Sequence, residues 1–156
     1  MTDHRACLRR GRTAAVGAAL LLALACVSCK DAYAQYKAEW AAFEKEYCSE
    51  DIHQAERALK RYRDKLHEIK ARPRADLDFD HLLAVAYARS SYLYAQLGRT
   101  NEAEQYFVSA TNHMNMQAKA GKVAYVPVTR ERISEIVEHA DSYMDVKWKK
   151  RRQPGE

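Results

Sequence analysis

The sequence has little of what catalytic and cofactor sites are usually built from. Glycine is scarce, with five residues in 156, and none belongs to a Gly-rich phosphate loop or a Gly-x-Ser-x-Gly nucleophile elbow. The histidines beyond residue 30 are scattered over different predicted helices: His53, His67, His81, His113 and His139. Glu135 and His139 stand four apart, which a solvated charged helix face explains better than a metal or acid–base site. We therefore expect a protein that is not an enzyme, with no catalytic residues and no bound metal.

The sequence also lacks a hydrophobic run long enough to cross a membrane. Its longest uncharged stretch, from Thr13 to Cys29, has 17 residues, whereas a membrane-spanning helix needs about 20. Arginines precede this stretch, residues 14–25 are almost entirely apolar, and small residues stand before a cysteine. These three parts are typical of a secretory signal peptide. An uncleaved transmembrane anchor is the alternative interpretation.

The end of this stretch resembles the cleavage site of bacterial lipoproteins, in which a small residue precedes the cysteine that becomes acylated. We prefer Cys26 as the acylated residue because Ala25 precedes it directly, at the end of the apolar region. Cys29 is the alternative, with Ser28 before it. Neither cysteine has the leucine that the family usually carries three positions earlier. The resemblance implies a covalent acyl or diacylglyceryl lipid and no other cofactor.

The same resemblance implies a place in the bacterial cell envelope, with a lipid anchor and the domain facing the periplasm. The residue after the acylated cysteine would be Val27 or Lys30. Neither is the aspartate that resembles an inner-membrane retention signal, so we expect the outer membrane. In an oxidising compartment Cys29 can pair with Cys48 if Cys26 carries the lipid. A packing role for Cys48 is the alternative.

Little net charge remains once the leader is set aside. Four arginines and Asp3 of the leader account for +3 of the formal charge of +5, and residues 147–152 hold much of the remaining positive charge. A nearly neutral body argues against nucleic-acid binding. We expect a signal peptide over residues 1–25, a tether over 26–32, a helical domain over 33–148 and a basic disordered tail over 149–156.

Apolar residues then recur at intervals of three and four, without the alternation typical of strands. The first segment places five rings on one helical face: Tyr33, Tyr36, Trp40, Phe43 and Tyr47. The pattern predicts five amphipathic helices, the fifth with Ile133, Val137 and Tyr143 on its apolar side. Candidate N-caps are Ser49, Asp76 or Asp78, Thr100 and Thr129, and Gly98 ends the third helix. Short connections predict an all-α fold of antiparallel hairpins.

The predicted third and fourth helices carry a more specific pattern. Their residues have the spacing of a tetratricopeptide repeat: Tyr87, Ser91, Tyr94, Leu97, Gly98, Ala103, Phe107 and Ala110. The hairpin resembles that family, with small Ser91 and Ala103 letting the helices approach, although Ser91 replaces the usual Gly or Ala and Asn115 the closing proline. A weaker match over residues 40–62 is either a degenerate repeat or an unrelated hairpin. The fifth helix would be a terminal cap.

The repeat resemblance implies a non-catalytic adaptor that binds an envelope protein through the concave face of its first helices. Carried over to this sequence, that face comprises Val85, Ala88, Tyr92, Ala95 and Gln96. Tyr92 is the strongest candidate for recognition because the packing pattern does not require a tyrosine there. The alternative function is a small-ligand-binding helical lipoprotein, in which the rings of the first helix surround an apolar pocket.

Overall fold

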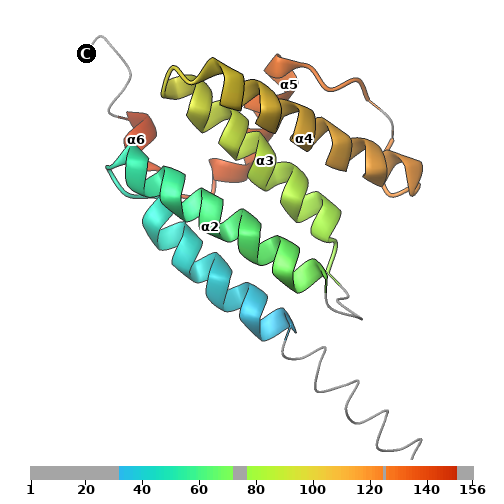
Figure 1. Cartoon of the computed structure of the whole chain (residues 1–156), viewed down its shortest axis with the longest axis horizontal. Helices are drawn as coiled ribbons and strands as arrows, with labels where there is room; N and C mark the ends of the chain where they lie inside the picture. Colours follow the sequence, from blue (N-terminus) through green and yellow to red (C-terminus); the bar gives the residue numbers. More distant parts are fainter. Residues whose placement is uncertain (1–31, 72–76, 125, 151–156) are drawn as a thin grey trace, which may run out of the picture.

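The computed structural model describes residues 32–71, 77–124 and 126–150. These residues form helices and connecting turns, and no strand occurs among them (Figure 1). A first helix over residues 32–47 is followed by α2 (Ile52–Lys70), α3 (Phe79–Gln96), α4 (Thr100–Lys119), α5 (Arg130–Asp141) and α6 (Lys147–Lys150). The predicted all-α fold is therefore confirmed. None of the helices in this part of the chain is long and apolar enough to cross a membrane.

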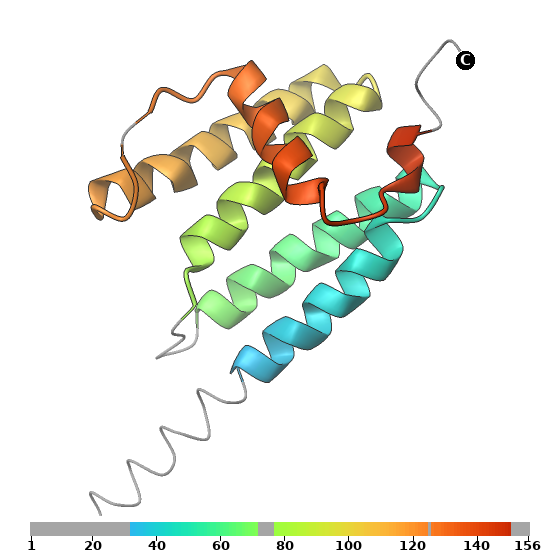
Figure 2. The ribbon, with the colours of Figure 1, turned by 180° about the vertical axis from the view of Figure 1, so that it is seen from behind.

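Aromatic rings join helix 32–47 to α2, which lies beside it in both views of the ribbon (Figure 1, Figure 2). The rings of Phe43 and Tyr62 stack with centroids 4.5 Å apart, and Phe43 and Tyr47 are almost completely buried. Tyr33, by contrast, is 48% exposed. The ring pattern therefore identifies the buried face correctly from the middle of the helix onward but fails at its first turn.

Asp51 caps α2, where the sequence predicts Ser49. The Asp51 side chain accepts a hydrogen bond from the backbone N–H of His53 at 2.9 Å. The Ser49 hydroxyl instead donates to the Asp51 carbonyl oxygen at 3.1 Å. Asp51 stands directly before the helix, so its carboxylate is the group that reaches the free N–H groups of the first turn.

A tight turn joins α3 to α4, and the two helices form a hairpin. Asp78 caps α3 by accepting a backbone N–H of the first turn at 3.2 Å, and Gly98 ends the hairpin's first helix with φ of +73°. The two helices approach at small residues, as predicted, because the Ser91 hydroxyl donates to the Ala103 carbonyl oxygen at 2.8 Å. Thr100 is the first residue of α4, which has no side-chain cap, so the prediction of Thr100 as an N-cap is wrong.

The helix α5 crosses the face of α3 (Figure 2). Thr129 caps it as predicted, through a hydroxyl that accepts a backbone N–H at 3.2 Å. The prediction fails for Tyr143, because α5 ends at Asp141 and Tyr143 is 82% exposed. A small apolar cluster fixes α5 on the second hairpin: Ala88, Ala110, Ile133 and Val137.

The end of the described chain returns to the first hairpin through α6. Trp148 is buried, and its ring meets that of Tyr47 edge-on at 5.8 Å. Its backbone N–H donates to a carbonyl oxygen of the turn before α2 at 3.2 Å. The predicted start of a disordered tail at residue 149 is therefore wrong, since Lys149 and Lys150 belong to α6.

Both ends of the sequence lie outside the described residues, namely residues 1–31 and 151–156. The predicted signal peptide, the lipid attachment at Cys26 or Cys29 and nearly all of the tether fall within them. These assignments remain predictions.

Candidate functional site

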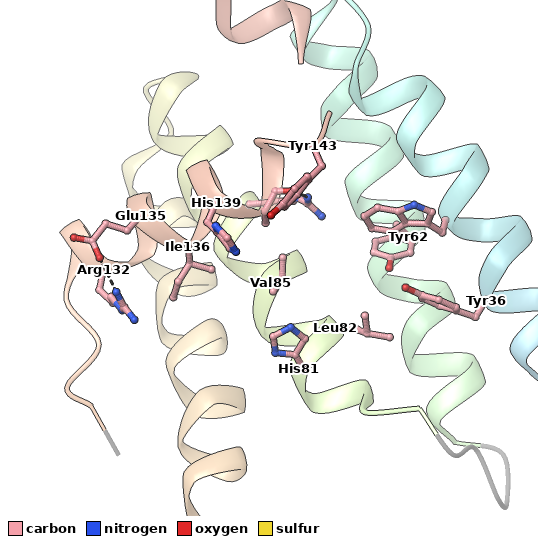
Figure 3. A pocket seen from close by; sticks show the side chains of 13 residues that line it. Tyr36, Tyr62, His81, Leu82, Val85, Arg132, Glu135, Ile136, His139 and Tyr143 are labelled. Carbon is pink, nitrogen blue, oxygen red and sulfur yellow. Dashed lines mark hydrogen bonds and ion pairs between the residues drawn. The ribbon is translucent and has the colours of Figure 1, made fainter. Parts of the chain in front are cut away.

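A cavity of about 650 Å³ opens between helix 32–47 and α2 on one side and α3 and α5 on the other (Figure 3). We call it the aromatic groove. One wall consists of three rings, from Tyr36, Trp40 and Tyr62, and the opposite wall consists of Leu82, Val85, Ile136, His139 and Ala140. Tyr143 extends over it from the segment after α5. A concave, mainly apolar space of this size is typical of a ligand-binding site.

The aromatic wall is held from behind by the core. The Trp40 ring packs 5.5 Å from the ring of Phe43 and 5.8 Å from that of Tyr62. Burial, together with the neighbouring Tyr36 hydroxyl, raises the pKa of Tyr62 above its ordinary value. Tyr62 therefore stays neutral, and the part of the wall that it forms carries no charge.

Polar side chains line the α3–α5 side of the groove: His81, Arg132, Glu135 and His139. Arg132 Nη1 lies 2.7 Å from Glu135 Oε2, and these side chains are 53% and 62% exposed. An ion pair so open to water is worth at most about 1 kcal/mol. A ligand can therefore replace this pair with its own contacts at little cost.

A buried cluster of charged groups adjoins the groove, and we call it the Asp141 hub. Arg89 Nε donates to Asp141 Oδ1 at 2.7 Å, with both side chains at most 5% exposed. Lys149 Nζ and the Tyr47 hydroxyl reach the other oxygen, Oδ2, at 2.5 Å and 3.1 Å. The Arg89 guanidinium also lies within 5.6 Å of three ring centroids, whose electron-rich faces attract a cation.

The hub fixes α5 relative to the first hairpin. Arg89 Nη2 donates to the Ala140 carbonyl oxygen at 2.9 Å, and both residues line the groove. Burial, and next the nearby Asp141 charge, raise the pKa of Tyr47 well above its ordinary value, so its hydroxyl remains a donor. A network of buried groups thus sets the distance between the two walls, and the groove is preformed.

The structure separates the five residues predicted to form a binding face. Val85 lines the aromatic groove. Ala88 is fully buried beneath α5, so it cannot contact a partner, and the predicted concave face is covered at that point. Tyr92 is half-buried, with Lys149 Nζ 4.7 Å from its ring centroid. Ala95 and Gln96 are exposed at the end of α3 that precedes the turn to α4.

The sequence analysis did not predict the Asp141 hub, although both Arg89 and Asp141 stand at sequence positions where a buried charge could have been recognised. Arg89 interrupts a run that is otherwise free of Lys, Arg, Asp and Glu from residue 81 to residue 98. Asp141 follows Ile133 and Val137 at four-residue intervals, which places it on the buried face of α5. A charged residue at a core position calls for a buried partner. The pairing itself spans 52 residues and depends on how α5 crosses α3.

No group of three or more His, Cys, Asp or Glu side chains in the described residues is arranged to hold a metal ion. Comparisons with protein-family models, with curated proteins and with solved structures found no match. The lipoprotein and repeat resemblances therefore rest on the residues that carry them.

Proposed function

We propose that this protein is a lipid-anchored lipoprotein of the bacterial envelope, facing the periplasm, whose helical domain is a non-catalytic protein-binding module. Its domain binds a segment of a partner protein in the aromatic groove. Attachment through Cys26, with Cys29 as the alternative, and kinship of the α3–α4 hairpin with tetratricopeptide repeats belong to the same proposal. Both rest on the sequence patterns alone.

The observation that carries this function is the preformed groove. It has an aromatic wall on one side and, on the other, an exposed ion pair that a ligand can replace with its own contacts. Tyrosine and tryptophan are the side chains that most often dominate protein–protein binding energy. Tyr36 and Trp40 are partly exposed in the groove, so a partner side chain placed there removes apolar surface from water. We place partner binding in this groove, and not on the predicted concave face, because α5 covers Ala88.

A second candidate function is the binding of a small ligand in the same groove. The volume of about 650 Å³ favours it, because pockets for small molecules usually measure about 300–1,000 Å³. This alternative predicts that the groove is occupied by a small molecule when the protein is isolated, with no partner protein bound to it.

Site-specific photo-crosslinking in envelopes tests the protein-binding function. A photoreactive residue at Leu82 stands in the groove, and one at Val108, 49% exposed on α4, serves as the matched control outside it. We expect a discrete protein adduct from Leu82 and none from Val108. Equal adducts from both positions, or none from Leu82, would contradict protein binding through the groove.

Acylation is tested separately by labelling cells with an alkyne-bearing palmitate. We expect the wild-type chain to incorporate label, Cys26→Ser to lose it and Cys29→Ser to keep it. The reverse pattern moves the anchor to Cys29. An unlabelled wild-type chain would contradict the lipoprotein assignment.

A further inference from the structure

A second cavity, of about 260 Å³, adjoins the aromatic groove. Four residues line both: His81, Val85, Arg132 and Ile136. The remaining walls of the second cavity come largely from the end of α4 and the segment between α4 and α5, with Met114, Val123, Val126 and Val128 among them. The two cavities thus adjoin along the boundary of α3 and α5, and we call them together the channel.

Exposed apolar side chains mark both ends of this channel. Tyr143 stands 82% exposed beside the aromatic groove, and Val123 and Val126, 48% and 54% exposed, stand beside the second cavity. Each end therefore suits an apolar group of a ligand.

The residues that line both cavities include one permanent cation, Arg132. His81 and Arg132 each lie in the first turn of a helix, α3 and α5 respectively, where the helix dipole adds positive potential. Glu135 is the one carboxylate among the described residues that line either cavity, and it is paired with Arg132. The Arg89 guanidinium is almost completely buried and is held by Asp141, which also binds Lys149. Arg132 is thus the cation available to a ligand's acidic group once Glu135 is displaced.

We propose, on the basis of the protein-binding function above, that the channel binds an extended peptide segment in which one acidic side chain stands between two apolar side chains. One apolar side chain enters the aromatic groove and the other enters the second cavity, while the carboxylate replaces Glu135 on Arg132. A fatty acid fits less well, because its carboxylate stands at one end of its apolar part whereas Arg132 stands where the two cavities meet.

Fluorescence polarisation with dye-labelled peptides tests this inference on the full-length protein in lipid nanodiscs, with empty nanodiscs as control. The peptides carry one glutamate with a leucine or phenylalanine two, three or four positions away on each side. Matched peptides replace the glutamate with glutamine, or both apolar residues with alanine. We expect at least one spacing to bind, and its glutamine counterpart to bind about two- to fivefold more weakly, as for a partly exposed ion pair.

Two protein variants give effects of opposite sign. Arg132→Gln should lower the affinity for the glutamate peptide to that for its glutamine counterpart. Glu135→Gln should raise the affinity for the glutamate peptide, because the competing carboxylate is gone. Equal binding of the glutamate and glutamine peptides would overturn the acidic preference while leaving groove binding intact. No binding at any spacing, or displacement of the peptide by equimolar dodecanoate, would overturn the inference; the Leu82 crosslink decides the protein-binding function independently.

Discussion

Two arginine–carboxylate pairs in this molecule have the same N–O distance of 2.7 Å and opposite surroundings. Arg89 and Asp141 are almost completely buried and join α3 to the end of α5. Arg132 and Glu135 are more than half exposed and lie within one turn of α5.

Burial, not geometry, separates the roles of the two pairs. Removing one partner of a buried pair leaves an uncompensated charge in a medium that cannot solvate it. Removing one partner of an exposed pair leaves a charge that water solvates. We therefore assign the first pair to holding the groove together and the second to contacting what enters the groove.

The largest expected effect comes from Asp141→Ala. It strands Arg89 without a carboxylate and also removes the acceptor of Lys149 and Tyr47. We expect a loss of about 3–5 kcal/mol in the free energy of unfolding, measured by urea denaturation. Glu135→Ala is the control at the exposed pair, and a similar small loss in both variants would contradict the distinction between the pairs.

The next effect tests the close contact of α3 with α4. Ala103 is 3% exposed, and its carbonyl oxygen accepts the Ser91 hydroxyl, so Ala103→Leu forces the helices apart. Overpacking of this kind costs about 1–3 kcal/mol. Val108→Leu, at an exposed position of the same helix, should leave the melting temperature nearly unchanged. An unchanged midpoint for Ala103→Leu would show that the hairpin is not packed as described.

These two substitutions mark how far the sequence alone predicts the structure. The close approach at Ser91 and Ala103 follows from local spacing, as do the caps at Asp78 and Thr129 and the glycine turn at Gly98. Each depends on residues within one hairpin or one helix end, so the chain's own periodicity contains the information.

The groove could not be predicted in the same way, because it forms where elements distant in the sequence meet. The sequence singles out Tyr36 and Trp40 as members of a ring stripe, yet whether a ring fills the core or lines a cavity depends on the position of α5. The same crossing of α5 over α3 buries Ala88 and removes it from the predicted binding face. The predictions of Thr100 and Ser49 as N-caps are wrong for a local reason, since in each case a different residue stands directly before the helix.

A smaller effect is expected at the outer edge of the hub. Lys149→Met removes a cation whose side chain is 20% exposed, so water replaces part of the lost contact. We expect a loss of about 1.5 kcal/mol, typical of a hydrogen bond to a charged group. Lys150→Met is the matched control, because Lys150 is exposed in the same helix and pairs with an exposed aspartate. Equal stability of the two variants would place Lys149 outside the hub.

Alkaline pH should weaken the same region gradually. The pKa of Tyr47 is raised in the folded protein, so the unfolded chain releases this proton first as the pH rises above about 10. Above about pH 10 the free energy of unfolding should therefore fall by up to about 1.4 kcal/mol per pH unit. Urea denaturation between pH 9 and pH 11 measures this slope, and Tyr47→Phe should reduce it. An unchanged slope in the variant would exclude Tyr47 as its source.

The smallest effect on stability is expected from Arg132→Gln. Water solvates the Glu135 carboxylate once its partner is removed, so the free energy of unfolding should change by less than about 1 kcal/mol. The variant should nevertheless change peptide binding in the channel. A large loss of stability in urea would show that this pair supports the fold and is not available to a ligand.

The most direct test of groove recognition measures the affinity of the partner captured through Leu82 for three variants whose melting temperatures are recorded in parallel. Leu82→Lys places a charge in the groove and should reduce affinity at least tenfold, while Val108→Lys should leave it unchanged. Tyr92 is the strongest recognition candidate on sequence grounds, but in the structure it packs against Trp148 and Lys149. Tyr92→Ala should therefore lower the melting temperature without changing the affinity for the partner. Unchanged affinity for a folded Leu82→Lys, with loss for Tyr92→Ala, would contradict recognition through the aromatic groove.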